Sequence, residues 1–206
     1  MDTCVLKGKH LIFLGSSVTY GSASGGVSFV EYIAKENGCS VTKEAVSGTT
    51  LADVEDISYI ARLKRITDER ADIFMCQLST NDATRKLPLG EVSGNFDKDS
   101  FDTKTVAGAI EYIIAYAREK WDCPVFFYTN PRYESMEYGE MVELLVKIAD
   151  KWKIGLLDFW NDKEFNRLTE EKKATLMADP IHPTKEGYKE LWTPRFVSLF
   201  TKALGN

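Results

Sequence analysis

An Asp-x-x-His pattern near the end of the chain holds the residues best suited to acid–base chemistry. Asp179 precedes His182 by three residues, so one loop can bring the carboxylate to the imidazole ring. A neutral imidazole can take a proton from a hydroxyl group, and a carboxylate can hold the ring in the correct tautomer. The only other histidine, His10, stands at the start of an expected strand, at the edge opposite the expected site. His182 is therefore the candidate base, although an Asp-x-x-His pattern by itself is more often an ordinary solvated loop.

A glycine-rich loop over residues 15–21 contains Ser17, a candidate nucleophile. Such a loop after a strand can also cradle a phosphate, but this one is neither G-x-G-x-x-G nor a loop that ends in Gly-Lys-Ser/Thr. It also differs from the G-x-S-x-G nucleophile elbow, because Thr19 stands where that motif has its second glycine. Taken alone, the loop is most simply a structural turn.

Two further loops offer hydrogen-bond donors. Gly48 follows a second apolar run, and the lack of a side chain lets its backbone approach a ligand closely. Asn81 follows a third run, and its side-chain amide can donate. Each loop alone is equally well explained as a turn. Hydrolytic acyl transfer, however, needs a nucleophile, a base, an orienting carboxylate and donors for a developing oxyanion, and the loops together supply all four.

The elements that must position these loops are five short apolar runs that alternate with helical patterns. The runs cover residues 10–14, 40–46, 72–78, 124–129 and 154–158. They are nearly continuous in apolar residues, as strands covered on both faces are. The first helical pattern begins at a capping box formed by Ser28 and Glu31. Further helical patterns cover residues 51–69, 106–121 and 138–152. A last helical pattern begins at about residue 184 and is interrupted at Pro194.

This alternation predicts an α/β fold in which a five-stranded parallel sheet has helices on both faces. Ligands of such sheets bind beyond the carboxyl ends of the strands. The loops with Ser17, Gly48 and Asn81 all leave those ends, and the loop with Asp179 and His182 follows the fifth strand.

Length and composition indicate one soluble domain over residues 1–206. The chain is 44% hydrophobic and 28% charged with a net charge of −5, which argues against nucleic acid or an anionic membrane as partner. No export signal or membrane span is recognisable, so a cytoplasmic location is expected. The four cysteines lack metal-ligand spacing, and we interpret them as structural. They are Cys4, Cys39, Cys76 and Cys123.

In four blocks the sequence resembles the SGNH (GDSL) hydrolase family. The blocks cover residues 13–21, 46–48, 79–82 and 179–183. The resemblance implies a flavodoxin-like three-layer sandwich, a Ser17–His182–Asp179 triad, and no metal or organic cofactor. It also implies an oxyanion hole made by the backbone N–H groups of Ser17 and Gly48 and the amide of Asn81. Ser16 and Ser79 depart from the family pattern, which usually has Asp and Gly at these positions.

The function expected from this resemblance is a serine esterase that hydrolyses short-chain carboxylic esters through an acyl-enzyme, with O-acetyl groups on carbohydrates favoured. The polar segment 82–102 is expected to border the cleft and to bury little of a longer acyl chain. The expected partner is a small-molecule ester, and the sequence does not indicate the oligomeric state. The alternatives are a lysophospholipase or thioesterase, a non-catalytic binding domain and, less favoured, a nucleotide-binding flavodoxin-like protein.

Overall fold

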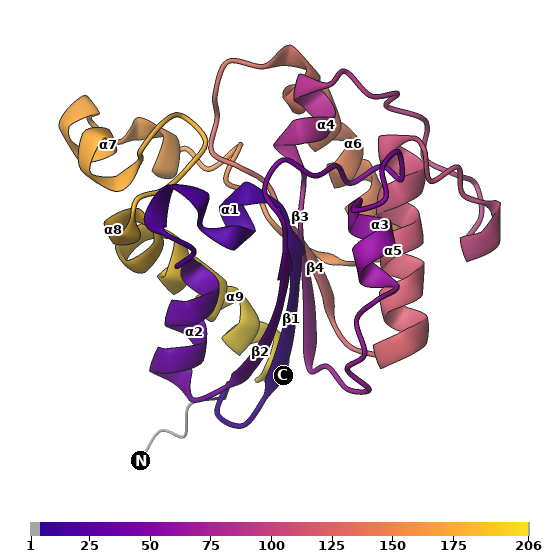
Figure 1. Cartoon of the computed structure of the whole chain (residues 1–206), viewed down its shortest axis with the longest axis horizontal. Coiled ribbons are helices and arrows are strands. Elements are labelled where there is room, and N and C mark those ends of the chain that lie inside the picture. The colour runs from indigo at the N-terminus through magenta and orange to yellow at the C-terminus, as the bar shows by residue number, and fades with distance from the viewer. Residues whose placement is uncertain (1–4, 206) are drawn as a thin grey trace.

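The computed structural model describes residues 5–205, and a five-stranded parallel sheet forms their centre (Figure 1). The strands are β1 (His10–Gly15), β2 (Ser40–Ala45), β3 (Ile73–Gln77), β4 (Val125–Tyr128) and β5 (Gly155–Leu157). They lie in the order β2-β1-β3-β4-β5. Gly15 is in register with Ala45, so β1 and β2 end together, and β3 flanks β1 on its other side. The predicted α/β architecture with an all-parallel sheet is confirmed.

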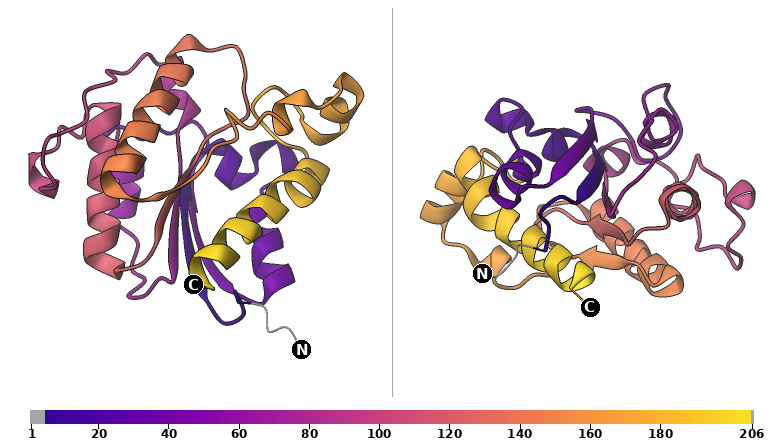
Figure 2. Two further views of the ribbon diagram at one scale, coloured as in Figure 1. Left: turned by 180° about the vertical axis from the view of Figure 1, so that it is seen from behind. Right: turned by 90° about the horizontal axis from the view of Figure 1, so that it is seen from below.

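Helices cover both faces of the sheet, and the right-hand view of Figure 2, from below, shows the sheet between two helical layers. One layer holds α2 (Phe29–Asn37) and α9 (Thr193–Leu204), and the other holds α3 (Tyr59–Leu63), α5 (Val106–Trp121) and α6 (Met136–Trp152). Short helices stand near the carboxyl edge of the sheet: α1 (Ser17–Tyr20), α4 (Thr80–Thr84), α7 (Glu170–Leu176) and α8 (Lys185–Gly187). Single turns lie at Ser22–Ser24, Lys98–Ser100 and Phe165–Arg167, and a π-helical segment covers Tyr188–Trp192.

The two faces of each central strand supply two separate cores, because successive side chains of a strand point to opposite faces. In β1, Leu11 and Phe13 pack with α2 and α9, where Phe29 stacks on Phe196 with ring centroids 4.0 Å apart. Ile12 of the same strand packs on the opposite face, against α3, α5 and α6. The outer strands β2 and β5 are only partly buried, because each has a single neighbouring strand. Strand β5 still packs on both helical layers, since Leu156 contacts one core and Leu157 the other.

The helix predicted over 51–69 is mostly a loop, and only Tyr59–Leu63 is helical. Side-chain carboxylates hold the backbone before it: Asp82 accepts from the N–H groups of Leu51 and Ala52, and Glu55 accepts from that of Thr50. These bonds compete with helical ones, and the helix starts only where the Ser58 hydroxyl caps it. By contrast, the predicted capping box of Ser28 and Glu31 is present at the start of α2.

The C-terminal helical pattern begins at Lys185 and changes character before Pro194. The segment Tyr188–Trp192 is π-helical, and the Thr193 hydroxyl donates to the carbonyl of Tyr188 where α9 begins. Pro194 stands in the first turn of α9, where its missing N–H costs nothing. Among residues 5–205, none of the helices is both long and apolar enough to cross a membrane. Cys39, Cys76 and Cys123 are buried, and Cys4 lies outside the described residues.

Candidate active site

Ser17 stands at the first position of α1, directly beyond the carboxyl end of β1. Its side chain is largely buried, with the residue 9% exposed. The turn before it requires glycine, because a Cβ on Gly15 would lie 1.8 Å from Oγ1 of Thr19. Gly21, with φ of 86°, closes the short helix by donating its N–H to the carbonyl of Ser17. The sequence thus gives Ser17 a tight strand–helix turn that holds its hydroxyl at the sheet edge.

His182 and Asp179 reach this hydroxyl from the other end of the chain. Nε2 of His182 lies 2.8 Å from Oγ of Ser17, and Nδ1 lies 2.7 Å from Oδ2 of Asp179. The second carboxylate oxygen, Oδ1, accepts hydrogen bonds from the N–H groups of Ile181 (2.7 Å) and His182 (2.8 Å). Partial burial alone would raise the pKa of Asp179, but these N–H groups and the His182 ring bring the pKa below its usual value. Asp179 is therefore ionised at neutral pH and able to orient the ring.

The loop that carries the pair is fixed at both ends and in its middle. The N–H of Ala178 donates to the carbonyl of His182, and the N–H of Thr184 donates to that of Leu176. The side-chain amide of Asn130, just beyond β4, donates to the carbonyl of Ile181. Asp179 and His182 therefore lie over the end of β4, whereas Ser17, which contacts His182, lies beyond the end of β1.

The loops with Gly48 and Asn81 leave the two strands that flank β1. Gly48 has a φ of 80°, and Nδ2 of Asn81 donates to the carbonyl of Thr49 at 2.9 Å, which joins the two loops. Asp82 accepts from two further N–H groups of the Gly48 loop, and burial raises its pKa. Arg85 donates to the Gly48 carbonyl at 2.7 Å. The structure thus places both candidate donors beside the turn that carries Ser17 and holds them there.

Two buried polar residues that sequence reasoning missed support these loops from below. Oε1 of Gln77 accepts from the N–H groups of Ser16 and Thr19 and from the Thr19 hydroxyl. The guanidinium of Arg62, 2% exposed, donates to the Gly15 carbonyl and to the Thr49 hydroxyl, both at 3.0 Å or less. Each is a polar residue inside an otherwise apolar strand or helix pattern, and this was the signal available in the sequence.

The two departures from the family pattern occupy different environments. Ser79 caps α4: its hydroxyl accepts from the N–H of Asn81 at 3.1 Å and donates to the carbonyl of Thr49 at 3.3 Å. A serine therefore adds contacts that a glycine lacks. Ser16 is fully buried beside the hydroxyl of Tyr59. The neutral serine therefore avoids the cost of burying the carboxylate that the family pattern usually has at this position.

The segment 82–102 contacts the Gly48 loop at its start, through Asp82 and Arg85. Leu89 and Val92 pack against the core, and the segment is tied to α5 and α6, because Glu111 accepts from the N–H of Ser93 and Lys151 donates to its carbonyl. The segment was expected to border the cleft, and it contacts the Gly48 loop through Asp82 and Arg85, whereas its part around Ser93 packs on α5 and α6.

A second Ser–His–Asp chain lies at the opposite edge of the sheet. Oγ of Ser40 is 2.8 Å from Nδ1 of His10, and Nε2 of His10 is 3.0 Å from Oδ1 of Asp68. This chain stands at the amino ends of β1 and β2, whereas Gly48 and Asn81 stand beyond the carboxyl ends of their strands. Linked Ser, His and Asp side chains therefore occur at both edges, and the chain with Ser17 stands at the edge that also carries the loops of Gly48 and Asn81.

The sequence of the chain matches the model of a known family. Residues 13–190 match the sequence model of the GDSL-like Lipase/Acylhydrolase family, which is most of the chain. The chain belongs to this family. The matched region includes Ser17, Gly48, Asn81 and the loop with Asp179 and His182. No curated protein matches this GDSL-family chain in sequence.

Solved structures share the fold of this GDSL-family chain at low sequence identity. A protein from Lactobacillus plantarum superposes with a TM-score of 0.78 and 19% identity, covering 95% of this chain and 97% of its own. A structure from Bacteroides ovatus, described as GDSL-like lipase, gives a TM-score of 0.66 and 18% identity, with 95% and 99% covered. A family two carbohydrate esterase from Clostridium thermocellum, in complex with cellohexaose, gives a TM-score of 0.65 and 16% identity. The match covers 96% of this chain and 65% of the esterase.

Proposed function

We propose that this protein is a serine ester hydrolase in which Ser17 is the nucleophile, His182 the general base and Asp179 the orienting carboxylate. The observation that carries the proposal is the continuous chain from Oδ2 of Asp179 through His182 to Oγ of Ser17, with links of 2.7 and 2.8 Å. This chain ends beside the loops of Gly48 and Asn81, and the family is one of lipases and acylhydrolases.

In the first half of the reaction, Oγ of Ser17 attacks the ester carbonyl carbon while Nε2 of His182 takes the hydroxyl proton. The carbonyl oxygen becomes an oxyanion, which accepts from the N–H groups of Ser17 and Gly48 and the amide of Asn81. The bond from carbon to the alcohol oxygen then breaks, and His182 gives its proton to that oxygen. Asp179 stabilises the imidazolium between these two transfers.

In the second half, water attacks the acyl group on Ser17 and His182 again takes a proton. The carboxylic acid leaves, and the proton returns to Oγ of Ser17. Each oxyanion donor is typically worth roughly 10²–10³ in rate. The fixed loops of Gly48 and Asn81 favour this contribution, because their donors need no rearrangement when charge develops.

A short acyl group is the preferred substrate in this proposal. Arg85 forms an ion pair with Glu55 at 3.0 Å and donates to the carbonyl of Gly48, so a pair of charged side chains lies beside the Gly48 loop. A methylene gains about 0.8 kcal/mol only when the protein buries it. These surroundings support acetate esters, including acetylated carbohydrates, and the carbohydrate esterase among the structural neighbours agrees with that choice.

Steady-state hydrolysis of 4-nitrophenyl acetate tests the proposal. Ser17→Ala and His182→Ala should each lower kcat by at least about 10⁴-fold. Ser40→Ala and His10→Ala are matched controls, because they remove the same groups from the hydrogen-bonded chain at the opposite edge. These controls should retain wild-type kcat. Near-normal turnover by folded Ser17→Ala protein, or equal losses in both pairs, would refute the assignment.

A further inference from the structure

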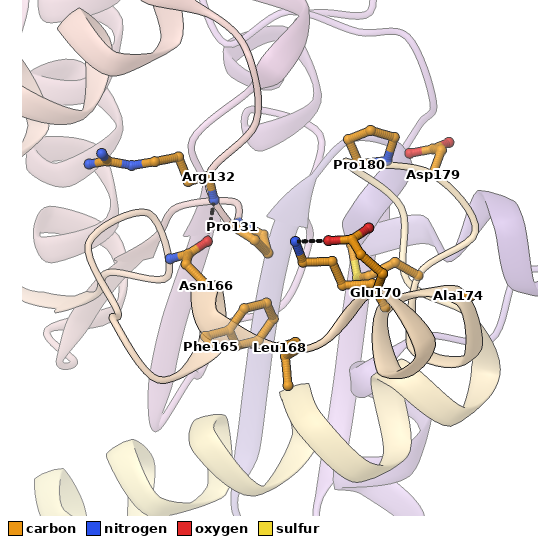
Figure 3. Close-up of a pocket in the computed structure, with 11 residues that line it drawn as sticks. Pro131, Arg132, Phe165, Asn166, Leu168, Glu170, Ala174, Asp179 and Pro180 are labelled. Atoms are coloured by element: carbon orange, nitrogen blue, oxygen red, sulfur yellow. Dashed lines mark hydrogen bonds and ion pairs between the residues drawn. The ribbon is translucent and has the colours of Figure 1, made fainter.

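A cavity with a volume of about 560 Å³ lies beside the candidate site, on the side of Asp179 (Figure 3). This volume falls within the roughly 300–1,000 Å³ of small-molecule sites. Phe165, Leu168 and Pro131 form apolar walls, and Asp179 lies across the cavity from Phe165 and Leu168. Ala174 of α7 also lines it.

Strand order separates this cavity from the oxyanion donors. Gly48 follows β2, Ser17 follows β1 and Asn81 follows β3, so these three occupy one half of the sheet edge. Pro131 follows β4 and Phe165 follows β5, so the cavity occupies the other half. The loop with His182 lies between the two halves, where Asn130 binds it over β4.

This arrangement identifies which part of an ester faces the cavity. The alcohol oxygen must lie close to Nε2 of His182, because that atom protonates it as the bond to the carbonyl carbon breaks. The carbonyl oxygen must point to the opposite side, toward Gly48 and Asn81. The alcohol part of the substrate therefore extends past His182 toward the cavity, and the acyl part does not.

The walls and the rim of the cavity indicate the kind of alcohol. The rim is charged: Glu170 and Lys173 form an ion pair at 2.9 Å, and the side chain of Asp179 is 48% exposed. An alkyl chain would remove these groups from water without giving them a partner, which costs free energy. A hydroxylated ring can pack one face on Phe165 and Leu168 and offer hydroxyl groups to the rim. The guanidinium of Arg132 points away from the cavity, toward Asn161.

We infer that this cavity binds the alcohol part of the substrate and that this alcohol is a hydroxylated ring such as a sugar unit. The inference rests on the proposed function, since it uses the direction in which Ser17 and His182 act. It assigns specificity to the segment 165–180, which follows β5, and not to the segment after β3.

The test compares acetate esters that share the acyl group and differ in the alcohol: ethyl acetate, octyl acetate and methyl 6-O-acetylglucoside. The wild type should have the highest kcat/KM on the glucoside. Ala174→Trp places a large ring in the cavity from an exposed helical position. It should lower kcat/KM for the glucoside at least about tenfold and change that for ethyl acetate less than about twofold. Thr175→Trp, next along α7 and outside this cavity, should change neither value.

Labelling of Ser17 by a fluorophosphonate separates this inference from the proposed function. The leaving group of the probe is fluoride, so Ala174→Trp should be labelled at the wild-type rate. If the wild type is neither labelled nor active on any ester, the proposed function is wrong. If Ala174→Trp is labelled normally and hydrolyses the glucoside as well as the wild type, the cavity assignment alone is wrong. A loss confined to octyl acetate, or an equal loss on all three esters, would also overturn it.

Discussion

Replacement of Asp179 by asparagine should abolish catalysis through the tautomer of His182 while leaving the loop intact. The N–H groups of Ile181 and His182 both donate to Oδ1 of Asp179. An asparagine must therefore place its carbonyl oxygen at this position and its NH₂ group at the position of Oδ2, 2.7 Å from Nδ1 of His182. Nδ1 then has to accept a hydrogen bond, and the ring proton moves to Nε2.

With its proton on Nε2, His182 donates to Oγ of Ser17 and cannot take the hydroxyl proton. Loss of the correct tautomer in a Ser–His–Asp triad lowers kcat about 10⁴-fold, which corresponds to roughly 5.5 kcal/mol in activation free energy. Because both backbone bonds to Oδ1 survive, the free energy of unfolding should fall by no more than about 1 kcal/mol. The large kinetic effect and the small effect on stability are predicted together.

The assay combines kcat for 4-nitrophenyl acetate, urea unfolding and the ¹⁵N chemical shifts of the His182 ring. Asp179→Asn should show a protonated Nε2 and an unprotonated Nδ1, and the wild type the reverse. Asp68→Asn is the matched control at the other Ser–His–Asp chain and should retain wild-type kcat. Activity of Asp179→Asn within tenfold of the wild type, or an unchanged tautomer, would refute this reasoning.

Three further predictions concern the donors and the loops that hold them. Asn81→Ala should lower kcat about 10²-fold with little change in KM, because the amide acts mainly once charge develops; steady-state kinetics would contradict this if only KM changed. Asp82→Ala should lower the free energy of urea unfolding by about 2–6 kcal/mol, since it leaves the buried N–H groups of Leu51 and Ala52 without acceptors at about 1–3 kcal/mol each. A loss below about 1 kcal/mol would show that the loop relaxes. The pKa of Asp179 is lower in the folded protein than the unfolded value of about 3.9, so its stabilising effect is present above that pH and is lost as the pH falls through the folded-state pKa. The difference in unfolding free energy between wild type and Asp179→Ala should therefore shrink as the pH falls below about 4, and a constant difference would contradict the assignment.

The sheet and the long helices were predictable because burial imposes a period on the sequence. In the run 72–78 every residue except Asp72 and Gln77 is apolar, and the stripe over 106–121 repeats at helical spacing. The prediction of a helix over 51–69 was wrong because a side chain distant in sequence fixes the backbone there. The carboxylate of Asp82 accepts hydrogen bonds from N–H groups of this segment. Local periodicity contains no information about such a bond.

The candidate site was predictable to a different degree for each residue. Ser17, His182 and Asp179 stand in recognisable patterns, and the structure brings these three together. Gln77 and Arg62 hold the turns by binding backbone groups, namely the N–H of Ser16 and the carbonyl of Gly15. Any residue type has these backbone groups, so the contacts produce no sequence motif. The cavity was missed for the same reason, since its walls come from segments that follow β4 and β5 and meet only in the folded chain.

The site of covalent attachment when the protein reacts with a fluorophosphonate tests most directly whether Ser17 is the nucleophile. Mass spectrometry of the intact protein should show one adduct, and peptide mapping should place it on Ser17. Ser17→Ala should remain unlabelled, His182→Ala should react far more slowly, and Ser40→Ala should be labelled at the wild-type rate. An adduct on any other residue, or full labelling of Ser17→Ala, would contradict the assignment of Ser17 as the nucleophile.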